Sequence, residues 1–247
     1  MKNKDILVYW FIPVFCVFLF HSCNSSDQNQ EEQVSVPADP AISNITQKIK
    51  ESPDDPSLYI ARASILFEKE GYDQAITDLN QAIALDSLSI EAHHLLADVY
   101  LKYFRSNNAI KTLEKIVELQ PDDQASLLKL AQFQLFLKQN ESAIQSLNKT
   151  LQLNPQNPEA FFLLGQCFKE MGDTSRAINS FQQAVELDPE IIDGWINLGQ
   201  LNAALGNKIA AQYFESGLAV APDNLNLMHA KAFYLADQEK LEEAIEV

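Results

Sequence analysis

From residue 41 onward, small, large and turn-forming residues recur with a nearly constant spacing. One series of small residues, spaced by 34 residues with a single step of 33, comprises Ala41, Ala75, Ala109, Ala143, Ala177, Ala210 and Ala244. In the first six repeats, a large apolar residue stands four positions after the alanine, and a turn residue, mostly Pro, stands twelve positions after it. A fixed period of this length indicates an array of structural repeats that stack on one another.

A second series of small residues predicts how each repeat folds. It comprises Ala63, Ala97, Ala131, Gly165, Gly199 and Ala232. Two small positions in each period allow two helices to approach closely, and the large residues fill the space toward the next repeat. The Pro ends the second helix, because the residue before a Pro is driven out of the α region. We also expect Gly71, Gly172 and Gly206 to take positive φ values at the ends of first helices.

The pattern resembles the tetratricopeptide-repeat (TPR) family. The family signature of aromatic, Leu-Gly, aromatic, Ala, Phe and Pro is reproduced by Phe161, Leu164, Gly165, Phe168, Ala177, Phe181 and Pro189. Gln134 and Asn202 stand where that signature has its second aromatic residue. The resemblance covers residues 41–247 and implies an all-α, right-handed solenoid of antiparallel helix pairs.

The period also predicts the layout of the array. Residues 41–52 form a leading helix, and five full repeats follow at about 56–89, 90–123, 124–157, 158–190 and 191–223. A sixth repeat starts near Leu225 and stops at Val247, inside its second helix. Because natural solenoids end in a polar capping helix, we expect further chain beyond Val247.

The first 22 residues have the pattern of a signal peptide. Lys2 and Lys4 form a basic start, and residues 6–20 form an apolar run that is too short to span a bilayer. Ser22 and Cys23 follow, which resembles a bacterial lipoprotein signal of the relaxed form found in Bacteroidetes. In that family the Cys becomes the new N-terminus and is acylated, for example with palmitate. Alternatively, residues 1–22 are a cleaved signal peptide without lipid or a plain membrane anchor.

The composition of the remaining chain limits its partners. Residues 23–40 are rich in polar and acidic residues, and we expect a disordered acidic tether there. The formal net charge is -16, so phosphate backbones of nucleic acids are unfavourable partners. The charge suits either plain solubility or a basic partner. With Cys16 removed and Cys23 acylated, Cys167 would stay alone, so no intrachain disulfide is expected.

Neither a catalytic motif nor a metal motif stands out. His93 and His94 are adjacent, so on a helix their side chains diverge by about 100° and cannot share a metal ion as an i, i+4 pair could. We expect Cys167 to be a small buried apolar residue, because a reactive thiolate needs an electropositive niche. Neither a Gly-rich phosphate loop nor a G-x-S-x-G elbow occurs. We therefore predict a protein that is no enzyme and that needs no metal or cofactor.

The TPR resemblance implies that ligands bind in a concave groove lined by the first helices. The repeat register places two neighbouring rows of side chains there. A mostly amide row contains Asp98, Gln132, Gln166 and Gln200, and a mostly apolar row contains His94, Leu128, Phe162 and Ile196. Such rows suit a peptide backbone and its apolar side chains. Alternatively, some of these side chains only pack between repeats.

These features together predict an adaptor that binds a protein or peptide and is anchored through Cys23 to the bacterial cell envelope, at the outer membrane. An enzyme whose substrate-binding part is this array, with a catalytic domain beyond Val247, is the alternative. A self-assembling structural module is a third hypothesis.

Overall fold

The computed structural model describes residues 39–247, and in this range the chain forms α-helices and no strand. The predicted signal peptide, Cys23 and all but the last two residues of the predicted tether lie outside it. The helices are α1 (Pro40–Glu51), α2 (Pro56–Glu68), α3 (Tyr72–Leu85), α4 (Ile90–Lys102), α5 (Ser106–Leu119), α6 (Gln124–Phe136), α7 (Asn140–Leu153), α8 (Pro158–Glu170), α9 (Thr174–Leu187), α10 (Ile192–Ala204), α11 (Ala210–Val220), α12 (Leu225–Asp237) and α13 (Leu241–Glu246).

Polar residues in the loops between repeats start most of the first helices, which are α2, α4, α6, α8, α10 and α12. The Asp123 carboxylate accepts a hydrogen bond from the Ser126 amide at 2.7 Å, and the Asn157 side chain accepts one from Ala160 at 2.8 Å. Asp55, Ser89 and Asn224 cap α2, α4 and α12 in the same way. These side chains satisfy backbone N–H groups that have no partner within the helix, so each first helix starts at a defined residue.

The turn inside each repeat depends on one residue in the left-handed region. Gly172 and Gly206 have φ values of +77° and +70°, as predicted. The prediction for Gly71 is wrong, because Gly71 has φ -78° and the preceding Glu70 takes φ 60° instead. The equivalent residues of other repeats are Phe104, Lys138 and Glu239. A C-cap in this conformation lets the next amides bond back to the helix, and Gly is the usual residue there but not an obligatory one.

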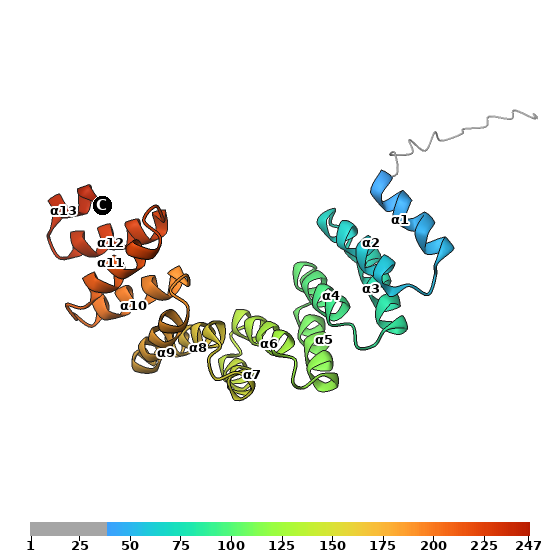
Figure 1. Ribbon diagram of the computed structural model, residues 1–247, viewed down its shortest axis with the longest axis horizontal. Coiled ribbons are helices and arrows are strands. Elements are labelled where there is room, and N and C mark those ends of the chain that lie inside the picture. Colours follow the sequence, from blue (N-terminus) through green and yellow to red (C-terminus); the bar gives the residue numbers. More distant parts are fainter. Residues whose placement is uncertain (1–38) are drawn as a thin grey trace, which may run out of the picture. The chain divides into compact units, whose positions relative to one another are not determined.

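The helices stack so that the first helices form one layer. Each repeat packs its two helices against one another, and α2 contacts α4, α4 contacts α6, α6 contacts α8, and α10 contacts α12. Figure 1 shows α4, α6 and α8 on one side of the stack and α5, α7 and α9 on the other. The small and large series meet in the interior, where Ala131, Leu147, Gly165 and Phe181 are all buried. The predicted all-α, right-handed TPR solenoid is confirmed for this part of the chain.

The two departures from the aromatic signature are buried polar residues with partners. Gln134 is 6% exposed, and its side-chain oxygen accepts a hydrogen bond from the Ser146 hydroxyl at 2.9 Å. Asn202 is 5% exposed, donates to the Leu198 carbonyl and accepts from Asn207. Because each of these buried groups has a partner, the substitutions avoid most of the desolvation penalty of burying an amide.

Candidate functional site

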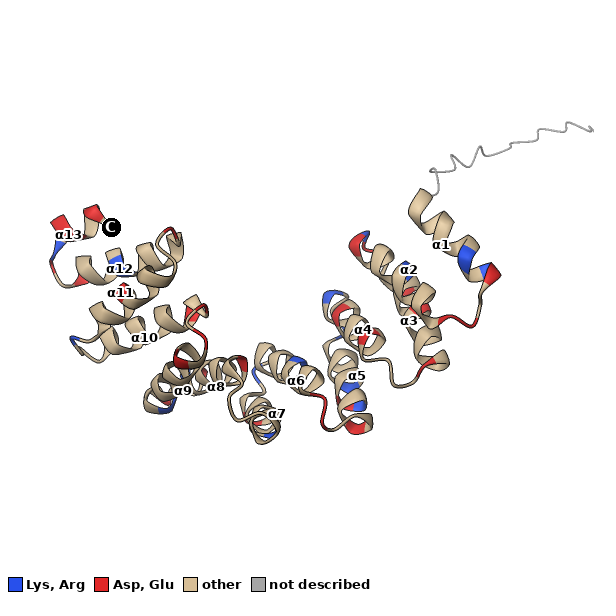
Figure 2. Cartoon of the chain, viewed as in Figure 1, with Lys and Arg blue, Asp and Glu red and all other residues tan. Residues whose placement is uncertain are grey.

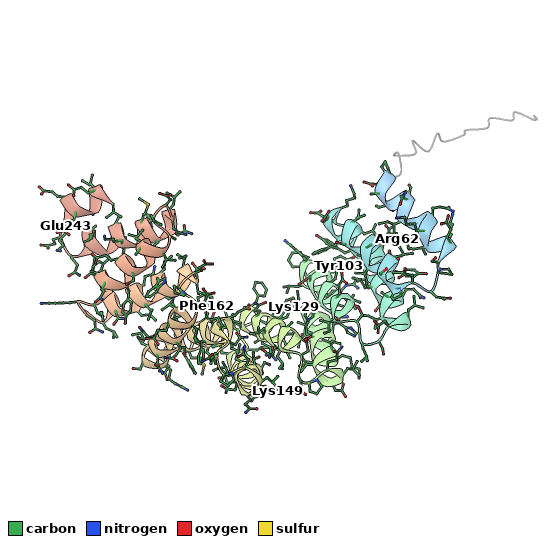
Figure 3. The ribbon with its side chains drawn as sticks, in the orientation of Figure 1. Arg62, Tyr103, Lys129, Lys149, Phe162 and Glu243 are labelled. Carbon is green, nitrogen blue, oxygen red and sulfur yellow. The ribbon has the colours of Figure 1, made fainter. Side chains whose placement is uncertain are left out.

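Three hollows follow one another along the layer of first helices. An N-terminal hollow of about 640 Å³ lies between α2 and α4, and a central hollow of about 690 Å³ lies among α6, α8 and α10. The third, which we call the C-terminal slot, has about 670 Å³ and lies mainly between α10 and α12. Figure 3 shows Lys129 and Phe162 on the side of the first helices and Lys149 on the opposite side. The surface predicted to hold a ligand is therefore hollowed at several places.

The residues predicted for the amide row are divided among these hollows. Asp98 lines the N-terminal hollow together with His94. Gln132 and Gln166 line the central hollow, and Gln200 lines the C-terminal slot together with Ile196. Each hollow thus contains two of the predicted groove residues, and no hollow contains all of them. That these residues bind a ligand stays a prediction.

Polar side chains of adjacent first helices bond to one another across the layer. The Lys129 ammonium of α6 donates to Asp98 of α4 at 2.8 Å, and a His94 ring nitrogen lies 2.9 Å from the Ser126 hydroxyl. The Gln132 amide donates to the Glu159 carboxylate of α8 at 2.7 Å. Asp98 and Gln132, two of the four residues of the predicted amide row, are therefore hydrogen-bonded within the protein. A ligand would have to displace these bonds or bind the two side chains in the orientation that the bonds impose.

Lys169 makes a comparable bridge one repeat further along, where its ammonium donates to Asn197 of α10 at 2.6 Å. These bridges were not predicted, because each side chain could equally well reach solvent or a helical neighbour. The partners lie 27 to 31 residues apart, which is somewhat less than one repeat, and this spacing is the sequence signal that could have revealed them.

The apolar row contributes to packing as well as to the surface. The Phe162 ring lies 5.7 Å from the buried Phe181 ring, measured between centroids, and Leu128 is also partly buried against the same core. Ile196 packs against the cluster around Phe214. Part of the surface of these side chains is therefore packed inside the array. A substitution such as Phe162→Ala would disturb the core, so it is a poor probe of ligand binding.

The electrostatic environment of the layer is mixed. Figure 2 shows acidic residues in the loops between repeats and both charge signs along the helices. Burial lowers the pKa of His94 below its usual value, and nearby Lys129 adds to this shift, while Asp123 and Asp98 oppose it. This shift favours the neutral form of His94, whose ring nitrogen can either accept a hydrogen bond from Ser126 or donate one to it.

Residues 39–247 hold no group of three or more His, Cys, Asp and Glu residues arranged to bind a metal ion. Cys167 is fully buried, and burial raises the pKa of its thiol to about 11, with a further contribution from Glu170. Among the same residues, no helix is long and apolar enough to cross a membrane.

Two family models match parts of the chain. A family model described as TPR repeat matches residues 63–102 and 165–206. A model described as anaphase-promoting complex, cyclosome, subunit 3 matches residues 102–184. No curated protein sequence matches the chain.

Solved structures with the same fold are numerous. The chain is similar to YrrB, described as a TPR protein with an unusual peptide-binding site, at 26% identity and a TM-score of 0.56, covering 77% of this chain and 99% of that one. It is also similar to PilF of Pseudomonas aeruginosa, at 20% identity and a TM-score of 0.65, covering 77% and 87%. The C-terminal part of a TPR protein of Cytophaga hutchinsonii matches at 20% identity and a TM-score of 0.65, covering 82% and 86%.

Proposed function

Because this chain is built from tetratricopeptide repeats, we propose that it is a non-enzymatic scaffold that is tethered to the bacterial cell envelope and binds a protein or peptide along its first helices. The observation that carries this proposal is the succession of hollows on one layer. Side chains from consecutive first helices line each hollow, so an extended partner would contact several repeats at once. Such repeated contacts let an array bind a partner through many small contributions to the binding free energy.

The chemistry of the layer supports a polypeptide partner. The central hollow offers Gln166 beside apolar Leu163 and Leu135, and it also contains Phe136, whose side chain is 69% exposed. An amide can both donate to and accept from a peptide backbone, and an exposed aromatic side chain provides apolar contact area. The solved structure of YrrB is described as having a peptide-binding site, which is consistent with this use of the fold.

The tether rests on the N-terminal sequence. The basic start, the short apolar run and the Ser22-Cys23 pair support acylation of Cys23 and retention at the envelope. A single acyl chain gives only marginal membrane binding, so stable attachment needs the multiple chains of a bacterial lipoprotein.

Site-specific photo-cross-linking in bacterial cells tests where partners bind. A photoreactive amino acid placed at Gln166, in the central hollow, should form cross-links to a protein partner. The same amino acid at Gln145, an exposed glutamine of the second helix α7, is the matched control and should form none. Equal cross-linking from both positions, or cross-linking from Gln145 alone, contradicts binding along the first helices.

A further inference from the structure

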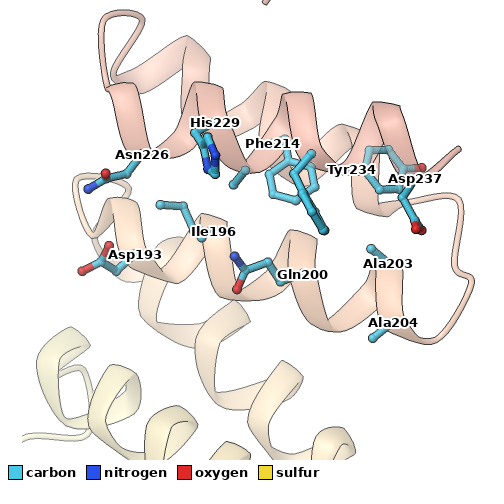
Figure 4. Close-up of a pocket in the computed structure, with 12 residues that line it drawn as sticks. Asp193, Ile196, Gln200, Ala203, Ala204, Phe214, Asn226, His229, Tyr234 and Asp237 are labelled. Carbon is cyan, nitrogen blue, oxygen red and sulfur yellow. The ribbon is translucent and has the colours of Figure 1, made fainter. Parts of the chain in front are cut away.

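The C-terminal slot combines apolar side chains with two acidic residues. It is lined by side chains of α10, α11 and α12, as Figure 4 shows. Ile196 and Gln200 of α10 lie opposite His229 of α12, and Phe214 and Tyr234 lie further along the slot. The slot therefore has an apolar middle section with a few polar groups beside it.

Two small residues open this slot. Ala203 and Ala204 end α10, and both line the cavity. The equivalent pairs in the four preceding repeats are larger, namely Phe67 and Glu68, Leu101 and Lys102, Leu135 and Phe136, and Lys169 and Glu170. Because alanine side chains stop at Cβ, the space that a longer side chain occupies elsewhere stays open here.

The apolar part of the slot can hold a bulky side chain. The Phe214 and Tyr234 rings pack at 5.6 Å between centroids, and Ala230 lies beside them. Phe233 also lines the slot, and its side chain is 71% exposed. Covering an exposed aromatic ring and this apolar section with a partner's side chain would remove apolar surface from water, which is favourable.

The charged residues that line the slot are both acidic. Asp193 lies at one end and Asp237 at the other, and neither Lys nor Arg lines the cavity. Both carboxylates belong to exposed residues. Asp193 of α10 is equivalent by the repeat to Asn226 of α12, and Asp237 lies eleven residues further along α12. Eleven helical residues correspond to roughly 16 Å along the helix axis. An extended peptide covers that distance in about five residues.

We propose that the C-terminal slot binds an extended peptide segment in which an aromatic or large aliphatic residue lies between two basic residues about five positions apart. The apolar residue would fill the section beside Phe214 and Tyr234, and the basic residues would reach Asp193 and Asp237. This inference rests on the proposed function and names the chemistry of the partner. The net charge of -16 also favours encounter with a basic segment.

Fluorescence anisotropy with a defined probe tests the inference. The probe is the labelled peptide Lys-Ala-Phe-Ala-Ala-Lys, titrated with the purified full-length chain in detergent. It should bind more tightly than the same peptide with Phe replaced by Ala or with both Lys replaced by Glu, and its affinity should fall as salt is added. Equal binding of all three peptides would overturn the proposal.

Two slot variants locate the binding site. Ala203→Leu places a side chain in the open space and should weaken binding roughly tenfold or more, since it fills the pocket for the anchor. Ala219→Leu on α11 is its control, because Ala219 is exposed and does not line the slot. Asp193→Asn with Asp237→Asn should weaken binding roughly three- to tenfold, as expected for two exposed ion pairs.

The charge control is Glu114→Gln with Glu141→Gln, which changes the net charge equally on exposed positions of α5 and α7. If the control pair weakens binding as much as the slot pair does, the effect is one of net charge and the inference fails. If Ala203→Leu binds the probe as the unaltered chain does, the slot is not the site. Either failure leaves the cross-linking test at Gln166 to decide the proposed function by itself.

Discussion

Gly165 of α8 lies directly against the Phe181 ring of α9, so closely that a Cβ atom on residue 165 would lie 2.6 Å from two ring carbons. Gly199 stands in the same relation to Phe214, with a corresponding distance of 2.5 Å. In the three earlier repeats, the equivalent pairs are Ala63 with Leu79, Ala97 with Leu113, and Ala131 with Leu147. A smaller residue on the first helix is thus paired with a larger residue on the second helix: Gly with Phe, and Ala with Leu.

We predict that Gly165→Ala destabilises the chain by about 1–3 kcal/mol, because the fully buried Phe181 cannot move away without disturbing its neighbours. Adding Phe181→Leu should restore most of the loss, since the double variant recreates the Ala–Leu pair of the preceding repeat. Urea unfolding followed by circular dichroism measures both. A single variant as stable as the unaltered chain, or a double variant less stable than the single one, would show that the contact does not govern packing.

A second contact, between Arg62 of α2 and Asp78 of α3, occurs in the first full repeat. Arg62 donates twice to the Asp78 carboxylate, with Nε–Oδ2 and Nη2–Oδ1 distances both of 2.7 Å, and Asp78 raises the pKa of Arg62. Arg62 also donates to Thr46, which ties α1 to the array. The equivalent residue in the next four repeats is leucine, at Leu96, Leu130, Leu164 and Leu198.

Asp78→Ala should lower the free energy of unfolding by about 2 kcal/mol, because the partly buried Arg62 loses two charge-assisted hydrogen bonds to its counter-ion. Arg62→Leu combined with Asp78→Ala should regain most of that loss, since an apolar pair has no charge to desolvate. Thermal unfolding of both variants measures this. The prediction is wrong if the double variant melts at or below the temperature of the single one.

Cys167 should be unreactive in the folded protein. With a pKa of about 11 and no exposed surface, roughly one thiol in a thousand is ionised at pH 8, and reagents cannot reach it. Mass spectrometry of the peptide containing Cys167 should show iodoacetamide labelling at pH 8 only after the chain is unfolded in urea. Equal labelling rates with and without urea would contradict the burial of this side chain.

Cys23→Ser should release the protein from the membrane fraction and abolish its labelling by fatty-acid analogues, because the anchor is expected on that thiol. Cys167→Ser is the matched control, since it removes a cysteine of the array and should leave both properties unchanged. If the Cys23→Ser chain stays bound to membranes and keeps residues 1–22, those residues act as an ordinary anchor.

The repeat spacing by itself determined the all-α solenoid and the two series of small residues and one series of large residues that form its core. Each helix pair contacts mainly its neighbours in sequence, so a local pattern repeated every 34 residues contains the information that the fold needs. The same locality explains why Gly165 could be assigned to a close helix contact before its partner was known.

The state of the predicted binding residues was decided only by the tertiary structure. Gln132 and Asp98 belong to the predicted row, yet Glu159 and Lys129 of neighbouring repeats engage them. The slot beside Ala203 was also not predicted, although the sequence has small residues at 203 and 204 where the four preceding repeats have larger ones. A long polar side chain has several partners within reach, and a cavity depends on how two helices diverge, so both require the positions of residues about one repeat apart in sequence.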